Sequence, residues 1–384
     1  MVAVGVAAIS LLIWIYMIVG RGMFWLARER DDRNQPADPA LWPSVCAVVP
    51  ARDEADVIGR SIGGLLAQDY PGPFRVVLVD DNSSDGTADV ARQTARALGA
   101  EDRLEVLTGG PLAHGWTGKL WAMSQGAARA KAHTPDFLLL TDADIAHTPD
   151  NLRRLVARAE AGGLTLVSLM AELRCDTFAE KMLIPAFVFF FDMLYPFGLV
   201  NDPRRKIAAA AGGCMLVRRG ALEAAGGVEA IRAAIIDDCA MGAIMKRQGP
   251  IWLGLTRRAQ SIRSYGGFPE ISRMVARSAY AQLNYSPLIL AGTILGMVLT
   301  YLAPPLFTVF GHGGARWMGL AAWLLMSLSF QPMLAFYRRS PLWGFAMPLI
   351  GALYSGFTVR SAVDVWTGKG GFWKGRAQAQ AGKA

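Results

Sequence analysis

Four long stretches without charged residues set the strongest limits on how this chain can fold. One lies at the start of the 384-residue chain and three follow one another near its end: residues 1–20, 287–310, 317–337 and 341–359. Each is close to the roughly 20 residues that a helix needs to cross a bilayer. A soluble core helix could account for one of them, but three in succession favour membrane helices. We therefore expect membrane segments at both ends of the chain.

The first stretch has the charge pattern of a retained anchor. Arg21, Arg28, Arg30 and Arg33 follow it, whereas a secretory signal would carry its basic residues before the apolar core. Arginines after a span favour the cytoplasmic side of the membrane. We therefore expect an anchor at residues 1–22 in the cell inner (plasma) membrane, with the residues that follow it facing the cytoplasm.

The C-terminal hydrophobic block is expected to cover residues 286–360, and a basic tail follows at 361–384. Four complete spans would place this tail outside the cell, although basic residues favour the cytoplasm. We therefore expect a multi-pass protein in which one apolar segment does not span the membrane. Pro304, Pro305 and Pro332 predict broken or kinked helices, which makes the second C-terminal stretch a candidate for a re-entrant segment.

The composition narrows the partners of the remaining chain. The formal net charge of +8 suits nucleic acid, anionic lipid or phosphate-bearing substrates. The sequence contains no nucleic-acid motif, so we expect lipid or phosphate partners and no nucleic acid. The cysteines have neither CxxC spacing nor a nearby histidine, which favours reduced, buried thiols over a disulfide or zinc framework. These cysteines are Cys46, Cys175, Cys214 and Cys239.

Residues 41–285 alternate short apolar runs with amphipathic stretches, which predicts one α/β domain with a mostly parallel sheet. The predicted strands are residues 45–49, 75–79, 104–107, 137–140 and 164–169. The predicted helices are residues 54–68, 87–98, 119–131 and 150–161. Ligands bind at the carboxyl ends of the strands in such sheets, and the acidic motifs of this chain fall at such ends.

The first two motifs each follow a predicted strand. Residues 50–54 read Pro-Ala-Arg-Asp-Glu, and their acidic pair either accepts hydrogen bonds from a nucleoside or forms the first turn of a helix. Asp80 and Asp81 open the second motif, which ends in the turn residues Asp85-Gly86-Thr87. A capped turn needs only one aspartate. Two adjacent carboxylates at a strand end would repel each other without a donor-rich partner, such as a base or ribose.

The third and fourth motifs carry the residues for chemistry. Asp142 and Asp144 leave an apolar strand at positions i and i+2. Mg²⁺ and Mn²⁺ bind through one or two such carboxylates plus phosphate oxygens, so this pair suits a metal that holds a diphosphate. Asp237 and Asp238 follow two isoleucines and precede an amphipathic stretch at 240–247. One of these acids can cap that helix, which leaves the other free to act as a general base.

In order and spacing, the motifs resemble those of the inverting family 2 glycosyltransferases with the GT-A fold. That family carries P-x-[RNE]-[ND]-E, D-D-x-S-x-D-G-T, D-x-D and [ED]-D in this order, and the resemblance covers residues 44–285. It implies a Rossmann-like domain of the nucleotide-diphospho-sugar transferase type. It also implies that Lys119, in a Gly-Lys-x-x-Ala segment, lies near the donor. A helix dipole disfavours a lysine in the first turn, so a nearby diphosphate would explain its position.

The resemblance also implies a role for each motif. The nucleotide-sugar, expected to be a UDP-sugar, would be bound by Pro50, Ala51, Glu54, Asp80, Asp81, Lys119 and Asp142. Asp144 and Asp142 would hold a divalent metal, Mg²⁺ or Mn²⁺. Asp238 would take the proton of the acceptor hydroxyl, and Asp237 would orient it. Two adjacent carboxylates push one pKa upward, which suits a base that works near neutral pH.

A closer resemblance is to the hopene-associated glycosyltransferases, which share the N-terminal anchor, the C-terminal hydrophobic block and a basic aromatic tail, here residues 371–376. The chain departs from processive synthases, whose Q-x-x-R-W motif has a tryptophan that stacks on a sugar acceptor. Its nearest matches place Ser264 or Ser278 at that position. This favours one transfer to a lipid acceptor, such as a hopanoid, over a growing glycan. Arg263 and Arg277 remain alternative ligands for the leaving diphosphate.

Two other functions predict different sequences. A nucleotidyltransferase would show a glycine-rich, basic segment near the first strand, and residues 50–60 have no such glycine run. A catalytically inert membrane scaffold would be expected to lose the acidic motifs, and all of them are present. Within the predicted domain, the apolar segment 184–200 is either a buried core helix or an interfacial segment that guides a lipid acceptor. The basic residues 204–206 that follow could face anionic headgroups.

Overall fold

The computed structural model describes residues 1–369, 372–373 and 376–377, and it divides into two compact units. The helical unit comprises Met1–Arg28, Cys175–Gly198 and Tyr265–Gly370. The sheet unit comprises Glu29–Arg174 and Leu199–Ser264, together with the described tail residues. Two segments that were predicted to belong to the α/β domain, 175–198 and 265–285, therefore cluster with the helical unit.

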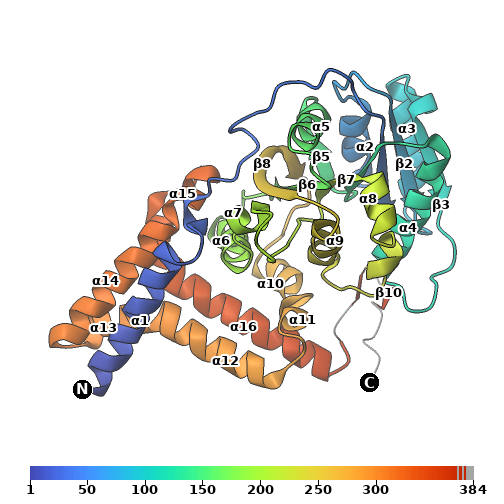
Figure 1. Cartoon of the computed structure of the whole chain (residues 1–384). Helices are drawn as coiled ribbons and strands as arrows, with labels where there is room; N and C mark the ends of the chain where they lie inside the picture. Colours follow the sequence, from blue (N-terminus) through green and yellow to red (C-terminus); the bar gives the residue numbers. More distant parts are fainter. Residues whose placement is uncertain (370–371, 374–375, 378–384) are drawn as a thin grey trace. The chain divides into compact units, whose positions relative to one another are not determined.

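The sheet unit is built on one eight-stranded sheet with the order β3-β2-β1-β4-β7-β6-β8-β5 (Figure 1). Its strands are β1 (Val45–Ala51), β2 (Phe74–Asp80), β3 (Leu104–Thr108), β4 (Phe137–Thr141), β5 (Ile145–His147), β6 (Leu166–Glu172), β7 (Cys214–Arg218) and β8 (Ile251–Ser261). The pairs β1·β2, β1·β4, β2·β3 and β6·β8 are parallel. Strand β7 is antiparallel to β4 and β6, and β5 is antiparallel to β8. The predicted α/β class with a mostly parallel sheet is confirmed.

Helices cover both faces of this sheet, because parallel strands carry apolar side chains on both sides. They include α2 (Ile58–Leu66), α3 (Thr87–Ala97), α4 (Gly118–Ala130), α5 (Asn151–Ala161), α8 (Arg219–Ala224) and α9 (Asp237–Lys246). In β1, Val45, Ala47 and Val49 share one core with α2, α3 and α5. Val48 points to the other face, where Gly126 lets α4 approach the sheet closely.

The predicted strands and helices of the sheet unit are present, with some shifted boundaries, and several elements were not predicted. The five predicted strands correspond to β1, β2, β3, β4 and β6, and the four predicted helices to α2, α3, α4 and α5. Helix α2 begins at Ile58 and not at residue 54. The cause is local: the backbone N–H groups of Asp53, Glu54 and Ala55 donate to side chains of the loop after β2. Strands β5, β7 and β8 were not predicted.

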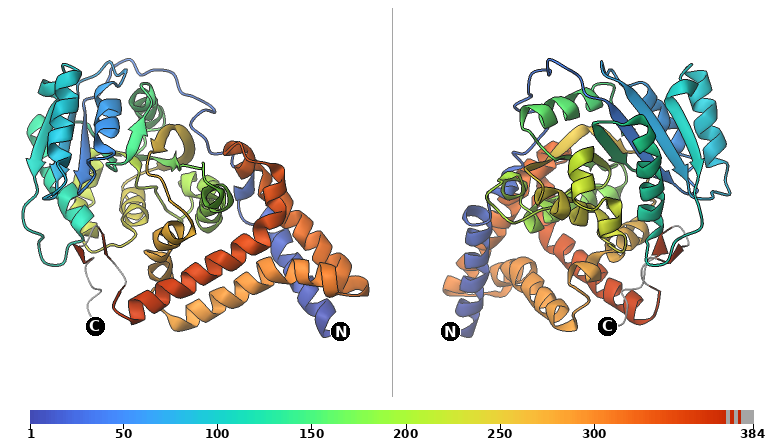
Figure 2. Two further views of the ribbon diagram at one scale, coloured as in Figure 1. Left: turned by 180° about the vertical axis from the view of Figure 1, so that it is seen from behind. Right: turned by 45° about the vertical axis from the view of Figure 1, so that its right-hand side comes forward.

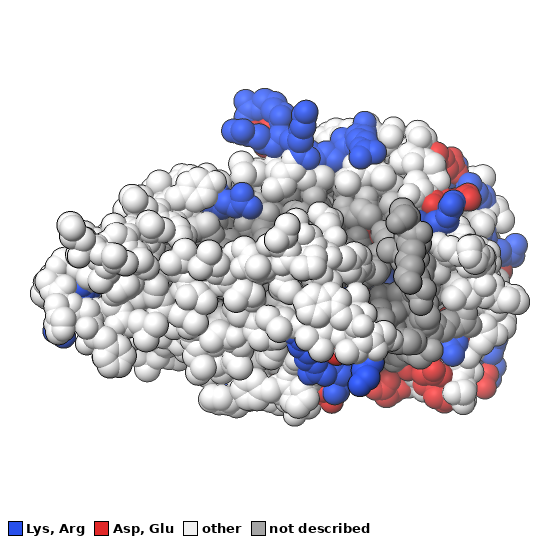
Figure 3. Space-filling view, turned by 90° about the horizontal axis from the view of Figure 1, so that it is seen from below, with Lys and Arg blue, Asp and Glu red and all other residues white. Residues whose placement is uncertain are grey.

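Most of the exposed large apolar side chains among the described residues lie in the helical unit. Its main helices are α1 (Val2–Val19), α6 (Phe178–Leu194), α10 (Phe268–Ala276), α12 (Pro287–Met297), α13 (Ala303–Phe310), α14 (Gly313–Ser329), α15 (Gln331–Phe336) and α16 (Met347–Trp366). Four helical stretches are long and apolar enough to cross a membrane: Val2–Val19, Pro287–Phe310, Gly313–Phe336 and Pro341–Trp366. Figure 3 shows a broad surface without charged side chains on the face that it views. These features are those of a membrane-associated protein.

Prolines interrupt the apolar helices where the sequence predicted irregular structure. A π-helical turn at Val298–Leu302 precedes Pro304 and Pro305, and Pro332 lies in the first turn of α15, just after α14 has ended. Proline lacks a backbone N–H, so it is tolerated in the first turn of a helix and disrupts the interior. Within the helical unit, α1 packs on α14, and α12 and α16 lie side by side (Figure 2).

Helix α6 contributes several buried apolar side chains to the helical unit. Its fully buried side chains include Leu183, Ile184, Val188 and Phe189. A capping box between Thr177 and Glu180 caps its N-terminus. This burial favours a core helix over an interfacial segment for most of residues 184–200. The predicted aromatic and basic tail motif at 371–376 lies partly outside the described residues; Phe372–Trp373 pairs with Arg376–Ala377 as a short antiparallel ladder.

Candidate active site

The acidic motifs meet at one edge of the sheet. Strands β1, β2 and β4 are parallel neighbours, so their carboxyl ends lie together, and the register pairs Ala51 with Asp80. Asp142 follows the last residue of β4 directly. Ligands of open α/β sheets bind at this edge, where backbone and side-chain groups beyond the strands converge.

The first two motifs form one interlocked structure. The backbone N–H of Asp81 donates to the carbonyl oxygen of Ala51 at 2.8 Å, and the N–H of Asp53 donates to Ser83 Oγ at 2.9 Å. Asp85 accepts from the N–H of Thr87 at 3.0 Å. These bonds fix the loop that holds Asp80 and Asp81, so part of the second motif serves structure.

Asp80 and Asp81 are both buried, and the chain itself supplies partners for them. Asp80 Oδ1 accepts from the N–H of Ser83 at 3.3 Å. The guanidinium of Arg52 lies 3.8 Å from Asp81 Oδ2, and its Nη1 also donates to the Asp81 carbonyl oxygen. The two adjacent carboxylates therefore have a cationic neighbour, Arg52, without a bound nucleoside. Arg52 was not among the site residues predicted from sequence, although it lies between Ala51 and Asp53 in the same motif.

Lys119 joins the third and fourth motifs. It lies in the first turn of α4, whose start is capped by Thr117. Its Nζ is 2.8 Å from Asp142 Oδ1 and 3.0 Å from Asp237 Oδ2. Burial by itself lowers the pKa of a lysine, but the two carboxylates outweigh burial and raise the pKa of Lys119 above its ordinary value. This ion-paired ammonium is the reason why a lysine is stable at a helix start.

Arg263 forms a second ionic link in the same place. It lies two residues beyond the end of β8, and its Nε donates to Asp144 Oδ2 at 2.9 Å. Its Nη2 donates to both carboxylate oxygens of Glu54, at 2.8 and 2.7 Å. Burial lowers the pKa of Arg263, and the Asp144 and Glu54 carboxylates reverse this and raise it. Of the two arginines considered from sequence, Arg263 lies among the acidic residues, whereas Arg277 belongs to the helical unit.

Asp238 is a carboxylate whose position is fixed by backbone donors. Its Oδ2 accepts from the N–H of Gly212 at 3.1 Å and its Oδ1 from the N–H of Cys239 at 2.7 Å. Burial, and then the charge of Asp237, raise the pKa of Asp238 to about 6. Helix α9 begins at Asp237 and has no side-chain cap, so the pair does not serve as a helix cap.

The acidic residues suit a divalent cation of the Mg²⁺ or Mn²⁺ type. Four carboxylates (Glu54, Asp142, Asp144 and Asp237) share two cations, Lys119 and Arg263, in the contacts described above. Burial raises the pKa of Asp142, and the Lys119 ammonium opposes that rise. Across the described residues, no three His, Cys, Asp or Glu side chains converge as a metal cage. Two carboxylates without a cage fit an ion that takes its other ligands from phosphate and water.

Two supporting residues were missed in the sequence. A Cβ on Gly212 would lie 3.3 Å from Lys119 Nζ and 3.5 Å from Asp238 Cβ, so glycine leaves room for both groups. His147 is buried beneath this edge of the sheet, with hydrogen bonds to Thr141 at 3.0 Å and Asn151 at 2.8 Å. Burial lowers the pKa of His147 to about 4, so it stays neutral and structural. Gly212 stands in a Gly-Gly pair before β7, a weak signal by itself.

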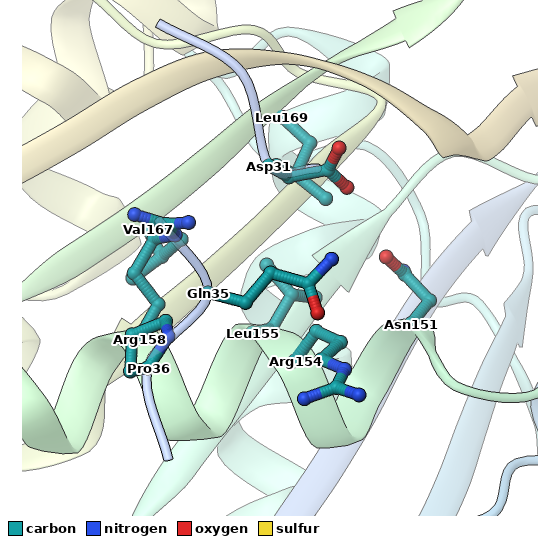
Figure 4. A pocket seen from close by; sticks show the side chains of 9 residues that line it. All are labelled: Asp31, Gln35, Pro36, Asn151, Arg154, Leu155, Arg158, Val167 and Leu169. Atoms are coloured by element: carbon teal, nitrogen blue, oxygen red, sulfur yellow. The ribbon is translucent and has the colours of Figure 1, made fainter. Parts of the chain in front are cut away.

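A small cavity of the sheet unit lies among other residues (Figure 4). Asp31 and Gln35 line it from the segment before β1, Asn151 and Arg154 from α5, and Leu169 from β6. None of the predicted site residues lines this cavity, so it is distinct from the acidic cluster.

Comparison with known proteins agrees with this geometry. Residues 46–226 match the model of glycosyl transferase family 2. A β-monoglucosyldiacylglycerol synthase of Synechocystis is 35% identical over 121 residues, which cover 31% of this chain and 24% of that protein. An N-acetylglucosaminyltransferase of Rhizobium leguminosarum is 26% identical over 184 residues, 46% of this chain and 41% of that protein. The chain thus spans less than half the length of these relatives.

The fold has a solved counterpart. A mannosyltransferase from Pyrobaculum calidifontis, determined in complex with GDP-Man and Mn²⁺, superposes with a TM-score of 0.53 at 17% identity, covering 95% of this chain and 99% of that one. At this identity the likeness concerns the fold. The chain therefore carries a glycosyl transferase family 2 domain with the GT-A fold, a domain of transferase enzymes.

Proposed function

We propose that this protein is a membrane-bound, inverting glycosyltransferase that moves one sugar from a nucleotide-sugar to a lipid acceptor. The observation that carries the proposal is Asp238, a carboxylate with a pKa raised to about 6 that two backbone N–H groups hold beside the Lys119–Asp142 ion pair. A base of this kind next to cations and acidic residues suits attack by a hydroxyl on a phosphate-activated sugar.

The donor would lie along the interlocked loops after β1 and β2. Pro50 and Ala51 end β1, and Asp80 and Asp81 offer buried carboxylates to the base and ribose of the nucleotide. We propose a UDP-sugar as the donor, as the family resemblance implies. Lys119 would supply positive charge to the diphosphate while Asp142 keeps the ammonium in place.

Asp144 and Asp142 would hold Mg²⁺ or Mn²⁺ when the donor is bound. Such an ion neutralises the charge that develops on the diphosphate as the sugar leaves. Lys119 and Arg263 lie on these same carboxylates and add two further positive charges beside the leaving group. The Pyrobaculum mannosyltransferase, which has the same fold, was determined in complex with GDP-Man and Mn²⁺. That complex supports a divalent ion as the cofactor.

Asp238 would act as the general base in a single displacement. Its carboxylate takes the proton of the acceptor hydroxyl as that oxygen attacks the anomeric carbon from the face opposite the leaving diphosphate. The bond from the anomeric carbon to the diphosphate oxygen breaks, and the configuration at that carbon inverts. Asp237 raises the pKa of Asp238, and its own contact with Lys119 holds it beside the base.

The helical unit and one relative support the proposal of a lipid acceptor. Four helices of this unit are long and apolar enough to cross a membrane. The Synechocystis relative takes its name from a glucosylated diacylglycerol. We propose a hopanoid or related polyprenoid as the acceptor, on the resemblance to the hopene-associated glycosyltransferases. We further propose that the sheet unit faces the cytoplasm from the inner (plasma) membrane, where nucleotide-sugars are available.

The test uses the full-length protein in lipid nanodiscs with UDP-sugars, Mn²⁺ and a hopanoid extract. Release of UDP together with a glycosylated lipid is the expected result. A nucleotidyltransferase would instead release pyrophosphate from UTP supplied with a sugar 1-phosphate and would form no glycolipid from the UDP-sugar, and an inert scaffold would consume no donor; either result would overturn the proposal. Mass spectrometry of lipids from cells with and without the gene then identifies the acceptor, as the glycolipid that disappears with the gene.

A further inference from the structure

Arg263 contacts two carboxylates that differ in their burial and in their number of contacts with it. One of its nitrogens, Nη2, donates to both oxygens of Glu54, whereas Nε donates to one oxygen of Asp144. Glu54 has only 8% of its side chain exposed, against 17% for Asp144. The arginine therefore has a more buried partner with two contacts and a more accessible partner with one.

Glu54 is held firmly by its own backbone. Its N–H donates to Thr87 Oγ1 at 2.9 Å, and its carbonyl oxygen accepts from Val57 at 3.0 Å and from Ile58 at 2.8 Å. It thus sits between the interlocked loops and the first turn of α2. A side chain on such a support can fix the position of a partner residue, because its own main chain has little freedom to move.

Asp144 has a second use in the proposed function, as a ligand of the divalent ion. The guanidinium of Arg263 and a metal ion would compete for the carboxylate of Asp144, because Arg263 Nε already bonds its Oδ2. If Asp144 were the only partner of Arg263, metal binding would release the arginine from the site. Glu54 prevents this release, because its contact with Arg263 remains when the metal binds Asp144.

We infer that Glu54 is a positioning residue for Arg263, which it keeps beside the diphosphate when the metal takes Asp144; this inference rests on the proposed function. In the described chain, Arg263 uses Nε and Nη2 for its protein contacts and leaves Nη1 without a protein partner. Nη1 can therefore bond a phosphate oxygen while Nη2 stays on Glu54. The resemblance to family 2 enzymes implies direct binding of the nucleotide-sugar by Glu54, whereas here its carboxylate acts through Arg263.

Two consequences distinguish this role from direct binding of the nucleoside. Metal alone binds weakly because Arg263 occupies Asp144, and metal with a nucleoside diphosphate binds more tightly because the phosphate draws Arg263 away. The neutral variant Glu54→Gln removes a negative charge, which by simple electrostatics favours the anionic UDP. Weaker UDP binding by this variant therefore reports a displaced Arg263 and not a change in charge.

The experiment is a double-mutant cycle on the full-length protein with Glu54→Gln, Arg263→Gln and the double variant. Binding of UDP is measured by calorimetry at saturating Mn²⁺, and binding of Mn²⁺ alone by electron paramagnetic resonance. We expect each single variant to bind UDP about tenfold more weakly, the scale of a hydrogen bond to a charged group. The double variant should bind UDP no more weakly than Arg263→Gln, because Glu54 has nothing left to position. Arg263→Gln should also bind Mn²⁺ alone about tenfold more tightly.

Glu160→Gln is the matched control, because Glu160 pairs with Arg218 at 2.8 Å on the surface of the same unit. It should leave both affinities unchanged. Losses of UDP affinity that multiply in the double variant would overturn the inference and favour direct binding by Glu54. Unchanged binding of Mn²⁺ alone by Arg263→Gln would overturn it as well. If the wild-type protein binds neither UDP nor GDP with Mn²⁺, the proposed donor is wrong, and the measurements with Mn²⁺ alone still decide whether Arg263 occupies the metal ligand.

Discussion

The charged residues of this site differ in the groups that compensate their charges. Lys119 lies between Asp142 and Asp237, and Arg263 lies between Glu54 and Asp144. Among the described residues, the Asp238 carboxylate has only backbone donors within bonding distance. A carboxylate without a cationic contact in a buried position is the one most easily protonated. This difference separates the proposed base from the proposed metal ligands.

The raised pKa of Asp238 makes stability depend on pH. Its pKa rises from 3.8 to about 6 on folding, so between these values the native state holds a proton that the unfolded state has lost. The contribution of Asp238 to the free energy of unfolding therefore falls as pH rises through this window and levels off above pH 6.

Relative to wild type, Asp238→Asn should gain about 1–3 kcal/mol in stability between pH 4 and pH 7. Thermal unfolding of the detergent-solubilised protein at several pH values measures this difference, and a pH-independent difference would show that the pKa is ordinary.

Asp144 is predicted to be needed for the metal and not for the fold. It lies beyond the end of β4 with 17% of its side chain exposed. Asp144→Ala should therefore lose Mn²⁺-dependent binding of UDP, while its melting temperature stays within a few degrees of wild type. Calorimetry with UDP and Mn²⁺ is the measurement, and Glu160→Gln serves again as the control. Unchanged affinity in Asp144→Ala would rule out the metal role.

Secondary structure elements bring these residues together through close packing of α4 on the sheet. A Cβ on Gly126 would lie 2.5 Å from Val48 Cγ1 and 2.9 Å from Val79 Cγ2, so α4 rests directly on β1 and β2. This contact also sets the distance of Lys119, at the start of the same helix, from the end of β4. Packing and site geometry are therefore linked through one helix.

Gly126→Ala should destabilise the protein although alanine is the better helix former. The added methyl group meets two stiff valine side chains, and overpacking of this kind costs about 1–3 kcal/mol. Gly220→Ala in α8 is the matched control, because nothing lies within 4 Å of its added Cβ. It should be neutral or stabilising by up to about 1 kcal/mol. Chemical unfolding followed by tryptophan fluorescence compares the two, and equal stabilities would show that α4 is packed less closely.

The sequence predicts the parallel half of the sheet better than the other half. Strands β1 and β4 are buried along their whole length, and β2 is buried except at Arg75, so that each contains an apolar run that is recognisable from sequence. Strand β8 contains Arg257 and Arg258 and pairs with β5 of only three residues, so neither has a clear pattern. The first three acidic motifs were predictable because each follows a strand, whereas Asp237 and Asp238 open helix α9 and follow no strand directly. The Arg263–Glu54 pair was not, since 209 residues separate its members and Arg263 reaches this edge through β8, a strand that was not predicted and that pairs with β5 and β6.

The whole molecule joins a transferase unit to a unit of apolar helices, and the chain passes between them more than once. The hydropathy of each segment predicts the apolar stretches, but it does not predict which segments pack into which unit. Residues 175–198 are apolar enough to read as the core of either unit, and only packing assigns them to the helical one. Membrane topology is therefore the property of the whole molecule that most needs a direct measurement.

The proposed orientation predicts which side of the membrane each unit faces. Gln93 is exposed on α3 of the sheet unit, and His312 is exposed between α13 and α14. In intact cells, an impermeant thiol reagent should label His312→Cys and should label Gln93→Cys only after permeabilisation. The wild-type protein gives the background from its four cysteines. Labelling of Gln93→Cys from outside would overturn the cytoplasmic placement, and with it access to cytosolic nucleotide-sugars.

Single-turnover kinetics of Asp238→Asn test the central claim, that Asp238 is the base for sugar transfer. Asparagine preserves the shape of the side chain but cannot take the proton of the acceptor hydroxyl. With saturating donor, the rate should fall about 10²–10⁴-fold while UDP affinity stays near that of wild type. Asp237→Asn, the adjacent control, should lose less because its role is to orient and tune its neighbour. A fully active, folded Asp238→Asn protein would contradict the account and place the base elsewhere.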